Sequence, residues 1–149
     1  MDPAVASYRS LIADVYELAG RSRSTSESLA QIHGHTAAQW HVLSVVSDEP
    51  QTVPAIAQRL GLVRQSVQRV VDDLVEHRLV DLIDNPRHRR SRLVEITPRG
   101  TTIVTHLFDA STKTRAELLR RAGVGSRDLD RARDVLRAII DAFDDEATT

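Results

Sequence analysis

Residues 53–74 carry the pattern that most constrains the fold, because two short helices that meet at a tight turn need certain residue types at fixed spacing. Ala57 supplies a small side chain where the helix axes would approach, and Gly61 tolerates the positive φ of the turn. Val67 and Val70 then supply the inner face of the second helix. Alanine, glycine at +4, and valine at +10 and +13 is the spacing of a helix-turn-helix.

The second of these helices is predicted to run from about Arg64 to His77 with two contrasting faces. Its apolar stripe, expected to face the core, is Val67, Val70, Val71, Leu74 and Val75. The polar side chains left facing outward are Arg64, Gln65, Ser66, Gln68 and Arg69. Arginine pairs with guanine, glutamine with adenine, and serine with either base or with phosphate. They lie in the N-terminal half, which usually enters the major groove, so this surface predicts base recognition. The alternative is an ordinary solvated helix surface.

A strongly basic hairpin is predicted directly after this helix. Residues 79–83 and 92–96 have strand character and are separated by a turn at Asp84-Asn85-Pro86. The arginines around the hairpin tip are Arg87, Arg89, Arg90 and Arg92. Residues 85–99 hold five arginines and one glutamate, a charge of +4, whereas the other 134 residues sum to −5. Arginines on such a wing can enter an adjacent minor groove. The alternative is a solvated turn, although a turn needs only the Asn-Pro pair.

Longer helices are predicted on both sides of this segment. Apolar residues recur at intervals of three and four over residues 4–32, with a weaker stretch at 20–28. The same periodicity returns over residues 98–121 and 126–143. Gly34 fits the left-handed C-terminal cap of the first helix.

Helix starts and helix faces together define the fold class. The predicted caps are Thr36 with Gln39 in a capping box, Thr52 before Pro54, Thr97 before Pro98, and Ser126. The fold class is therefore mainly α with a small β-hairpin wing. We expect a winged helix-turn-helix DNA-binding domain at 36–97 and a helical dimerisation region formed by 1–35 plus 98–149. Two DNA half-sites about 34 Å apart suit a twofold dimer.

The composition argues against several kinds of chemistry. The chain has 149 residues and no cysteine, which excludes disulfides, thiol nucleophiles and thiolate metal ligands. It has neither a Gly-x-Ser-x-Gly elbow nor a phosphate-binding glycine loop, so we expect no enzyme activity and no cofactor. Without a signal peptide or a sufficiently apolar segment, a cytoplasmic protein is expected. The formal net charge of −1 gives no hint of nucleic-acid binding, but it averages the basic wing with an acidic remainder.

In its motifs the sequence resembles the multiple-antibiotic-resistance regulator (MarR) family of bacterial winged-helix transcription factors. The matching segments are Thr36-Ala-Ala-Gln-Trp-His-Val-Leu, Thr52-Val-Pro-Ala-Ile-Ala-Gln-Arg-Leu, Val67-Gln-Arg-Val-Val-Asp-Asp-Leu, Leu79-Val80, Asn85-Pro-Arg-His-Arg-Arg and Leu93-Val-Glu-Ile-Thr-Pro-Arg-Gly. The resemblance covers about residues 5–145. It implies a homodimer, formed by the first helix and the two C-terminal helices, that binds a pseudo-palindromic operator. It further implies a repressor relieved by a small ligand.

One position departs from the family pattern. The wings of such proteins commonly carry an aspartate two residues before the arginine that enters the groove, and here His88 stands before Arg90. A neutral imidazole can accept a hydrogen bond from the guanidinium, whereas a protonated imidazole would repel it. We therefore expect the DNA affinity of this protein to depend more on pH than that of an aspartate-bearing relative.

The resemblance also implies a ligand pocket between the first helix, the helix at 36–47 and the start of the fifth helix. The residues expected to line it are Tyr16, Trp40, His41 and His106, which suit an aromatic or phenolic acid. Trp40 is more simply explained as core. Two alternatives stay open: a metal-responsive regulator that uses His33 and His35, and a winged-helix protein-interaction module that does not bind DNA.

Overall fold

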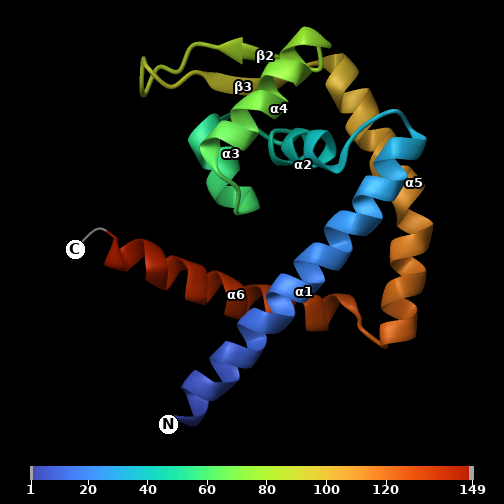
Figure 1. The fold of residues 1–149 in the computed structure, drawn as a ribbon, viewed down its shortest axis with the longest axis vertical. Coiled ribbons are helices and arrows are strands. Elements are labelled where there is room, and N and C mark those ends of the chain that lie inside the picture. The colour runs from blue at the N-terminus through green and yellow to red at the C-terminus, as the bar shows by residue number, and fades with distance from the viewer. Residues whose placement is uncertain (1, 148–149) are drawn as a thin grey trace. The chain divides into compact units, whose positions relative to one another are not determined.

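The computed structural model describes residues 2–147, which form helices and one small antiparallel sheet (Figure 1). The elements are α1 (Pro3–Ile32), α2 (Ala37–Val45), β1 (Gln51–Thr52), α3 (Val53–Leu60), α4 (Arg64–Glu76), β2 (Val80–Ile83), β3 (Leu93–Ile96), α5 (Pro98–Ala122) and α6 (Ser126–Glu146). They divide into two compact units, one ending at Ala110 within α5 and the other beginning at Ser111. The predicted fold class, mainly α with a β-hairpin wing, is confirmed.

The helix starts follow the predicted capping chemistry. The Thr36 hydroxyl accepts the backbone N–H of Gln39 at 3.1 Å, and the Gln39 side chain accepts the Thr36 N–H at 3.0 Å. The Thr97 hydroxyl accepts the Gly100 N–H at the start of α5. Gly34 has φ +79°, as expected of a left-handed cap, and α1 continues unbroken through the weaker 20–28 stretch.

We expect Thr52→Ala to destabilise the protein by about 1 kcal/mol. The Thr52 hydroxyl accepts the Ala55 N–H at 3.2 Å, and alanine would leave that first-turn amide without its side-chain acceptor. Urea unfolding at a fixed protein concentration measures the change. Thr52→Ser keeps the acceptor and should restore most of the loss. Equal stabilities of the wild type and the alanine variant would contradict this role of Thr52.

The sheet has three strands in the order β1-β3-β2, all antiparallel. The predicted hairpin is confirmed as β2 paired with β3, with Leu82 opposite Val94. The third strand, β1, was not predicted. It is only two residues long, and Gln51 pairs with Val94, far along the chain. Strand β2, which follows α4, is thus joined through β3 to β1, the segment that precedes α3.

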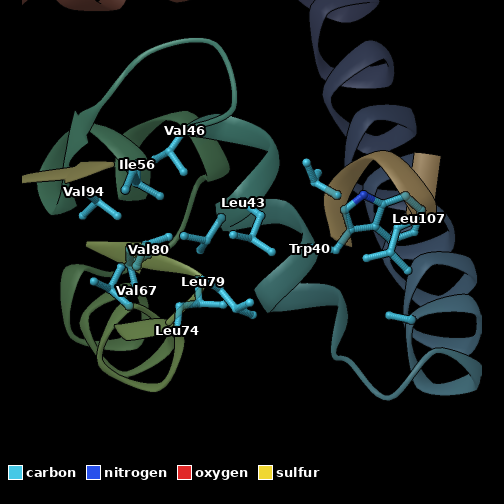
Figure 2. Close-up of a cluster of buried hydrophobic side chains, with 14 of the residues drawn as sticks. Trp40, Leu43, Val46, Ile56, Val67, Leu74, Leu79, Val80, Val94 and Leu107 are labelled. Carbon is cyan, nitrogen blue, oxygen red and sulfur yellow. The ribbon is translucent and has the colours of Figure 1, made fainter. Parts of the chain in front are cut away.

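The core of the first unit gathers side chains from α2, α3, α4, the sheet and the first half of α5 (Figure 2). Its fully buried large side chains are Trp40, Leu43, Ile56, Leu74, Leu107, Val42, Val46, Val67, Val71, Val80 and Val94. The prediction that Val75 belongs to the buried stripe is wrong, because its side chain is 36% exposed. A helix stripe that packs on one side has edges, and Val75 lies at such an edge.

The second unit consists of the end of α5 and the whole of α6. The prediction that Ser126 caps α6 needs correction: Gly125 is the N-cap residue, and the Asp128 carboxylate accepts its N–H at 3.0 Å. On α6 the apolar residues Leu129, Ile140 and Phe143 are exposed in the single chain. Near the end of α5, Arg120 lowers the pKa of Glu117 by a side-chain hydrogen bond on an exposed surface.

Candidate nucleic-acid interface

The helix-turn-helix places the polar half of α4 on the surface. Gly61 adopts φ +65°, and the next amide, that of Leu62, donates to the Ala57 carbonyl at 2.9 Å, which closes the turn between α3 and α4. Val67 and Val71 are buried beneath α4. The five predicted recognition residues are all exposed: Arg64, Gln65, Ser66, Gln68 and Arg69. The apolar side of α4 is therefore packed against the core, and its polar side is accessible to a partner.

The wing is held in shape by two of its own polar side chains. The Asn85 amide donates to the Ser91 carbonyl at 2.9 Å, and the Asn85 side-chain oxygen accepts the Arg87 N–H at 3.1 Å. The Arg92 guanidinium donates to the Leu82 carbonyl across the hairpin at 2.7 Å. Sequence reasoning gave Asn85 a role only in the turn and assigned Arg92 to DNA. The structure gives both an additional role in bracing the hairpin.

A groove of about 510 Å³ is lined by residues of both α4 and the β2–β3 wing. Its described lining residues are Val53, Pro54, Arg64, Gln65, Gln68, Leu82, Arg90, Ser91 and Arg92. This lining contains three arginines and no acidic residue. Two signals that lie more than twenty positions apart in the sequence thus meet in one basic concavity, and the β2–β3 hairpin extends outward beyond α4 (Figure 1).

The remaining predicted DNA-binding residues lie outside the lining of this groove. Ser66 and Arg69 are exposed on α4, and Arg87 and Arg89 are exposed at the wing tip. Gln68 donates from its side-chain amide to Asp72 at 2.8 Å. One amide hydrogen of Gln68 is therefore engaged within the helix, and the amide oxygen is left as the group that can accept from a base.

The residues predicted to line a ligand pocket are only partly brought together. Trp40 is buried in the core, where its ring meets Phe108 edge-on at 6.1 Å, while His41 is half-buried beside it. Tyr16 is 75% exposed and lies about 24 Å along α1 from Ile32, at 1.5 Å per residue. His106, by contrast, contacts the C-terminal end of α1, because its Nε2 lies 3.1 Å from Nδ1 of His33.

His33 and His106 lie in the wall of a smaller cavity of about 240 Å³. It is lined by His33, His35, Thr102, Ile103, His106 and Leu107. Of the four predicted ligand residues, His106 alone lines this cavity, and His33 lines it through its contact with His106. Within residues 2–147, the structure groups no three histidine or acidic side chains in a way that could hold a metal ion.

The fold and the groove together define a winged helix-turn-helix protein. The MarR family profile matches residues 33–91, from the end of α1 to the wing tip. An uncharacterised protein of Mycobacterium tuberculosis is 43% identical over 133 residues, which is 89% of this chain and 92% of that relative. The chain belongs to the MarR family of transcription regulators.

Solved structures agree in fold. The transcriptional regulator BldR from Sulfolobus solfataricus is similar with a TM-score of 0.78 at 20% identity, over 95% of this chain and 99% of that one. A MarR variant from E. coli in complex with operator DNA is similar with a TM-score of 0.66 at 18% identity, over 86% and 92% of the two chains. Within the described residues, no helix is both long enough and apolar enough to span a membrane.

Proposed function

We propose that this protein is a homodimeric regulator that binds a pseudo-palindromic operator on double-stranded DNA, most simply as a repressor. The observation that carries the proposal is the groove in which Arg64, Gln65 and Gln68 of α4 face Arg90 of the wing. Major-groove bases are read by such side chains on a helix, and a neighbouring minor groove accepts arginine. The E. coli relative of similar fold was solved with operator DNA, which supports the same use of this surface.

Apolar residues on the helices outside the winged domain support the proposed dimer. The exposed apolar residues of α6 and those of α1, among them Val5 and Tyr8, need a cover that the single chain does not provide. We assign residues 1–35 plus 98–149 to dimerisation and 36–97 to DNA binding. A twofold dimer would carry two recognition helices to two half-sites.

The proposal is tested by titrating the DNA upstream of the protein's own reading frame with the purified protein. A specific duplex should bind much more tightly than a scrambled duplex of the same length, and the affinity should fall steeply with salt. Equal affinity for both duplexes would contradict the proposed sequence-specific binding to an operator. Absence of binding to either duplex would favour the alternative, a winged-helix protein-interaction module that does not bind DNA.

We further propose that a small ligand controls the binding of this protein to DNA. The cavity lined by His33, His35 and His106 has imidazole donors beside the apolar side chains of Ile103 and Leu107, which suits a small aromatic acid. Salicylate, titrated into the protein–operator complex, should release the DNA if this class of ligand acts here. His106→Ala should abolish the release while leaving DNA binding intact.

His88 gives the DNA affinity a dependence on pH. Its side chain is exposed at the wing tip, where a neutral imidazole can accept a hydrogen bond from the Arg90 guanidinium and a protonated imidazole would repel it. Operator affinity should therefore fall as pH falls from about 8 to about 6. His88→Asp, which remains an acceptor over this range, should give a flat profile. Superimposable profiles of the wild type and the aspartate variant would contradict this role of His88.

A further inference from the structure

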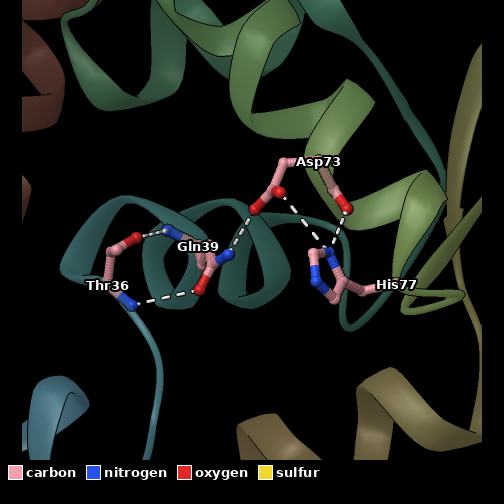
Figure 3. Close-up of polar contacts among 4 residues, drawn as sticks. All are labelled: Thr36, Gln39, Asp73 and His77. Atoms are coloured by element: carbon pink, nitrogen blue, oxygen red, sulfur yellow. Dashed lines mark hydrogen bonds and ion pairs between the residues drawn. The ribbon is translucent and has the colours of Figure 1, made fainter.

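The side chain of Gln39 makes two kinds of contact at once (Figure 3). Its oxygen accepts the Thr36 N–H at 3.0 Å, which completes the capping box of α2. Its amide nitrogen donates to the Asp73 carboxylate on α4 at 2.5 Å, across 34 positions of sequence. Both ends of one amide are thus used, and the start of α2 is joined to the recognition helix.

The choice of glutamine at this position points to the second contact. Glutamate completes a capping box as well as glutamine does, because only the side-chain oxygen is needed. A carboxylate, however, has no N–H to donate and would stand against Asp73 as a like charge. The bridge to α4 is therefore the contact for which Gln39 needs an amide.

Asp73 is held from two sides. One carboxylate oxygen accepts from Gln39, and the other lies 3.4 Å from Nδ1 of His77, one turn further along α4. The same imidazole nitrogen is 2.8 Å from the Asp73 carbonyl (Figure 3). The carboxylate has a fixed direction, which is what a positioning contact requires.

The bridge also continues toward α1. The Ala37 N–H, in the first turn of α2, donates to the Glu27 carboxylate at 2.8 Å. Hydrogen bonds therefore run from α1 through the first turn of α2 to α4. Since α1 belongs to the proposed dimerisation region, the bridge joins the helix that would fix the partner to the helix that would read DNA.

We propose that Gln39 is a positioning residue for the recognition helix: through Asp73 it fixes the direction in which α4 presents its base-reading side chains to DNA. This inference rests on the DNA-binding function proposed above. In this role Gln39 acts through Asp73 and not through a contact of its own with DNA. Loss of the hydrogen bond between Gln39 and Asp73 should weaken sequence-specific binding. The contacts to phosphates depend on charge and should persist.

The test is the ratio of specific to non-specific affinity, measured far below the melting temperature. The probes are the upstream duplex and its scrambled counterpart. Gln39→Glu keeps the capping box but breaks the bridge, so the ratio should fall about tenfold, the scale of one lost base contact. In Gln39→Glu/Asp73→Asn the donor and acceptor are exchanged, the net charge equals that of the wild type, and the ratio should return to within about threefold of it.

Matched variants separate this role from a general loss of stability. Asp73→Ala should lower the ratio as Gln39→Glu does, and it provides the second route should the glutamate variant fail to fold. Glu76→Gln, which removes one negative charge from the exposed side of the same helix, should leave the ratio unchanged. A purely structural role would lower the melting temperature and both affinities together.

The outcomes also separate this inference from the proposed function. If the wild type shows no preference for the upstream duplex, the proposed function is wrong and this inference falls with it. If the wild type shows the preference and Arg64→Ala relaxes it, the function stands. In that case an unchanged ratio in Gln39→Glu, or a double variant as weak as Gln39→Glu, overturns the inference alone.

Discussion

The double variant Arg64→Ala/Arg90→Ala is expected to bind the operator at least about 100-fold more weakly than the wild type. Arg64 comes from the first turn of α4 and Arg90 from the wing, and both line the same groove. A good base contact by arginine is worth about 1–3 kcal/mol, and each substitution occurs twice in a dimer. The two losses should be close to additive, because the side chains would reach different grooves of the DNA.

The single variants should differ in kind. Arg64→Ala should relax the preference at one base position of each half-site, since its loss removes a base contact. If Arg90 contacts mainly phosphates, Arg90→Ala should weaken binding to all sequences and flatten the salt dependence by about one unit per wing. Competition binding against a set of single-base operator variants, repeated at several salt concentrations, measures both effects.

Arg131→Ala is the matched control. It removes the same charge from an exposed position on α6, away from the winged domain in sequence, and should leave specific affinity within about twofold of the wild type. If Arg64→Ala and Arg90→Ala both leave operator binding unchanged, the assignment of the groove is wrong. A loss as large in Arg131→Ala would mean that net charge or dimerisation, and not the groove, controls binding.

The parts of this fold that could be predicted from sequence are those decided by neighbours along the chain. Thr36 and Gln39 form their capping box within four residues, and Gly61 adopts its positive φ because the next helix must begin at once. The hairpin was recognisable because strand periodicity and a turn lie within one short segment. Local patterns therefore identified the helix α4 and the β2–β3 hairpin correctly.

What could not be predicted depends on pairs that are distant in sequence. Strand β1 exists only because Gln51 pairs with Val94, and two residues carry no periodicity of their own. The bond from Gln39 to Asp73 and the contact of His33 with His106 span 34 and 73 positions. Arg92 was assigned to DNA because arginine on a wing has that use, and nothing local indicates that it also braces Leu82.

Gly100→Ala is expected to destabilise the protein by about 1–3 kcal/mol. Alanine in a helix is normally favoured over glycine by roughly 0.5–1 kcal/mol, so the expected sign is the reverse of the usual one. Gly100 is buried in the first turn of α5, where a Cβ would lie 2.2 Å from the Leu79 carbonyl oxygen and 2.8 Å from a side-chain carbon of Ile96. Backbone would have to move to admit the methyl group.

The Leu79 carbonyl cannot easily give way, because it is itself bonded. It accepts the Thr97 N–H at 3.0 Å, while the Thr97 hydroxyl lies 2.8 Å from the Arg78 carbonyl and 3.1 Å from the Leu79 carbonyl. These contacts join the start of β2 to the start of α5. A methyl group on residue 100 would therefore push on the junction from which the wing strands extend. We expect Gly100→Ala to weaken DNA binding as well as folding.

Gly20→Ala provides the control, since Gly20 lies within α1 with no atom near the position of a Cβ. That variant should be more stable than the wild type by about 0.5–1 kcal/mol, as the helix preference for alanine requires. Urea unfolding of the three proteins at one concentration, with dimerisation held constant, measures the change in the free energy of unfolding for both variants and shows its sign. If both alanine variants were more stable than the wild type, the backbone around position 100 would be able to accommodate a methyl group, and the prediction for Gly100→Ala would be wrong. Opposite signs would show that close approach of the backbone, and not helix preference, requires glycine at position 100.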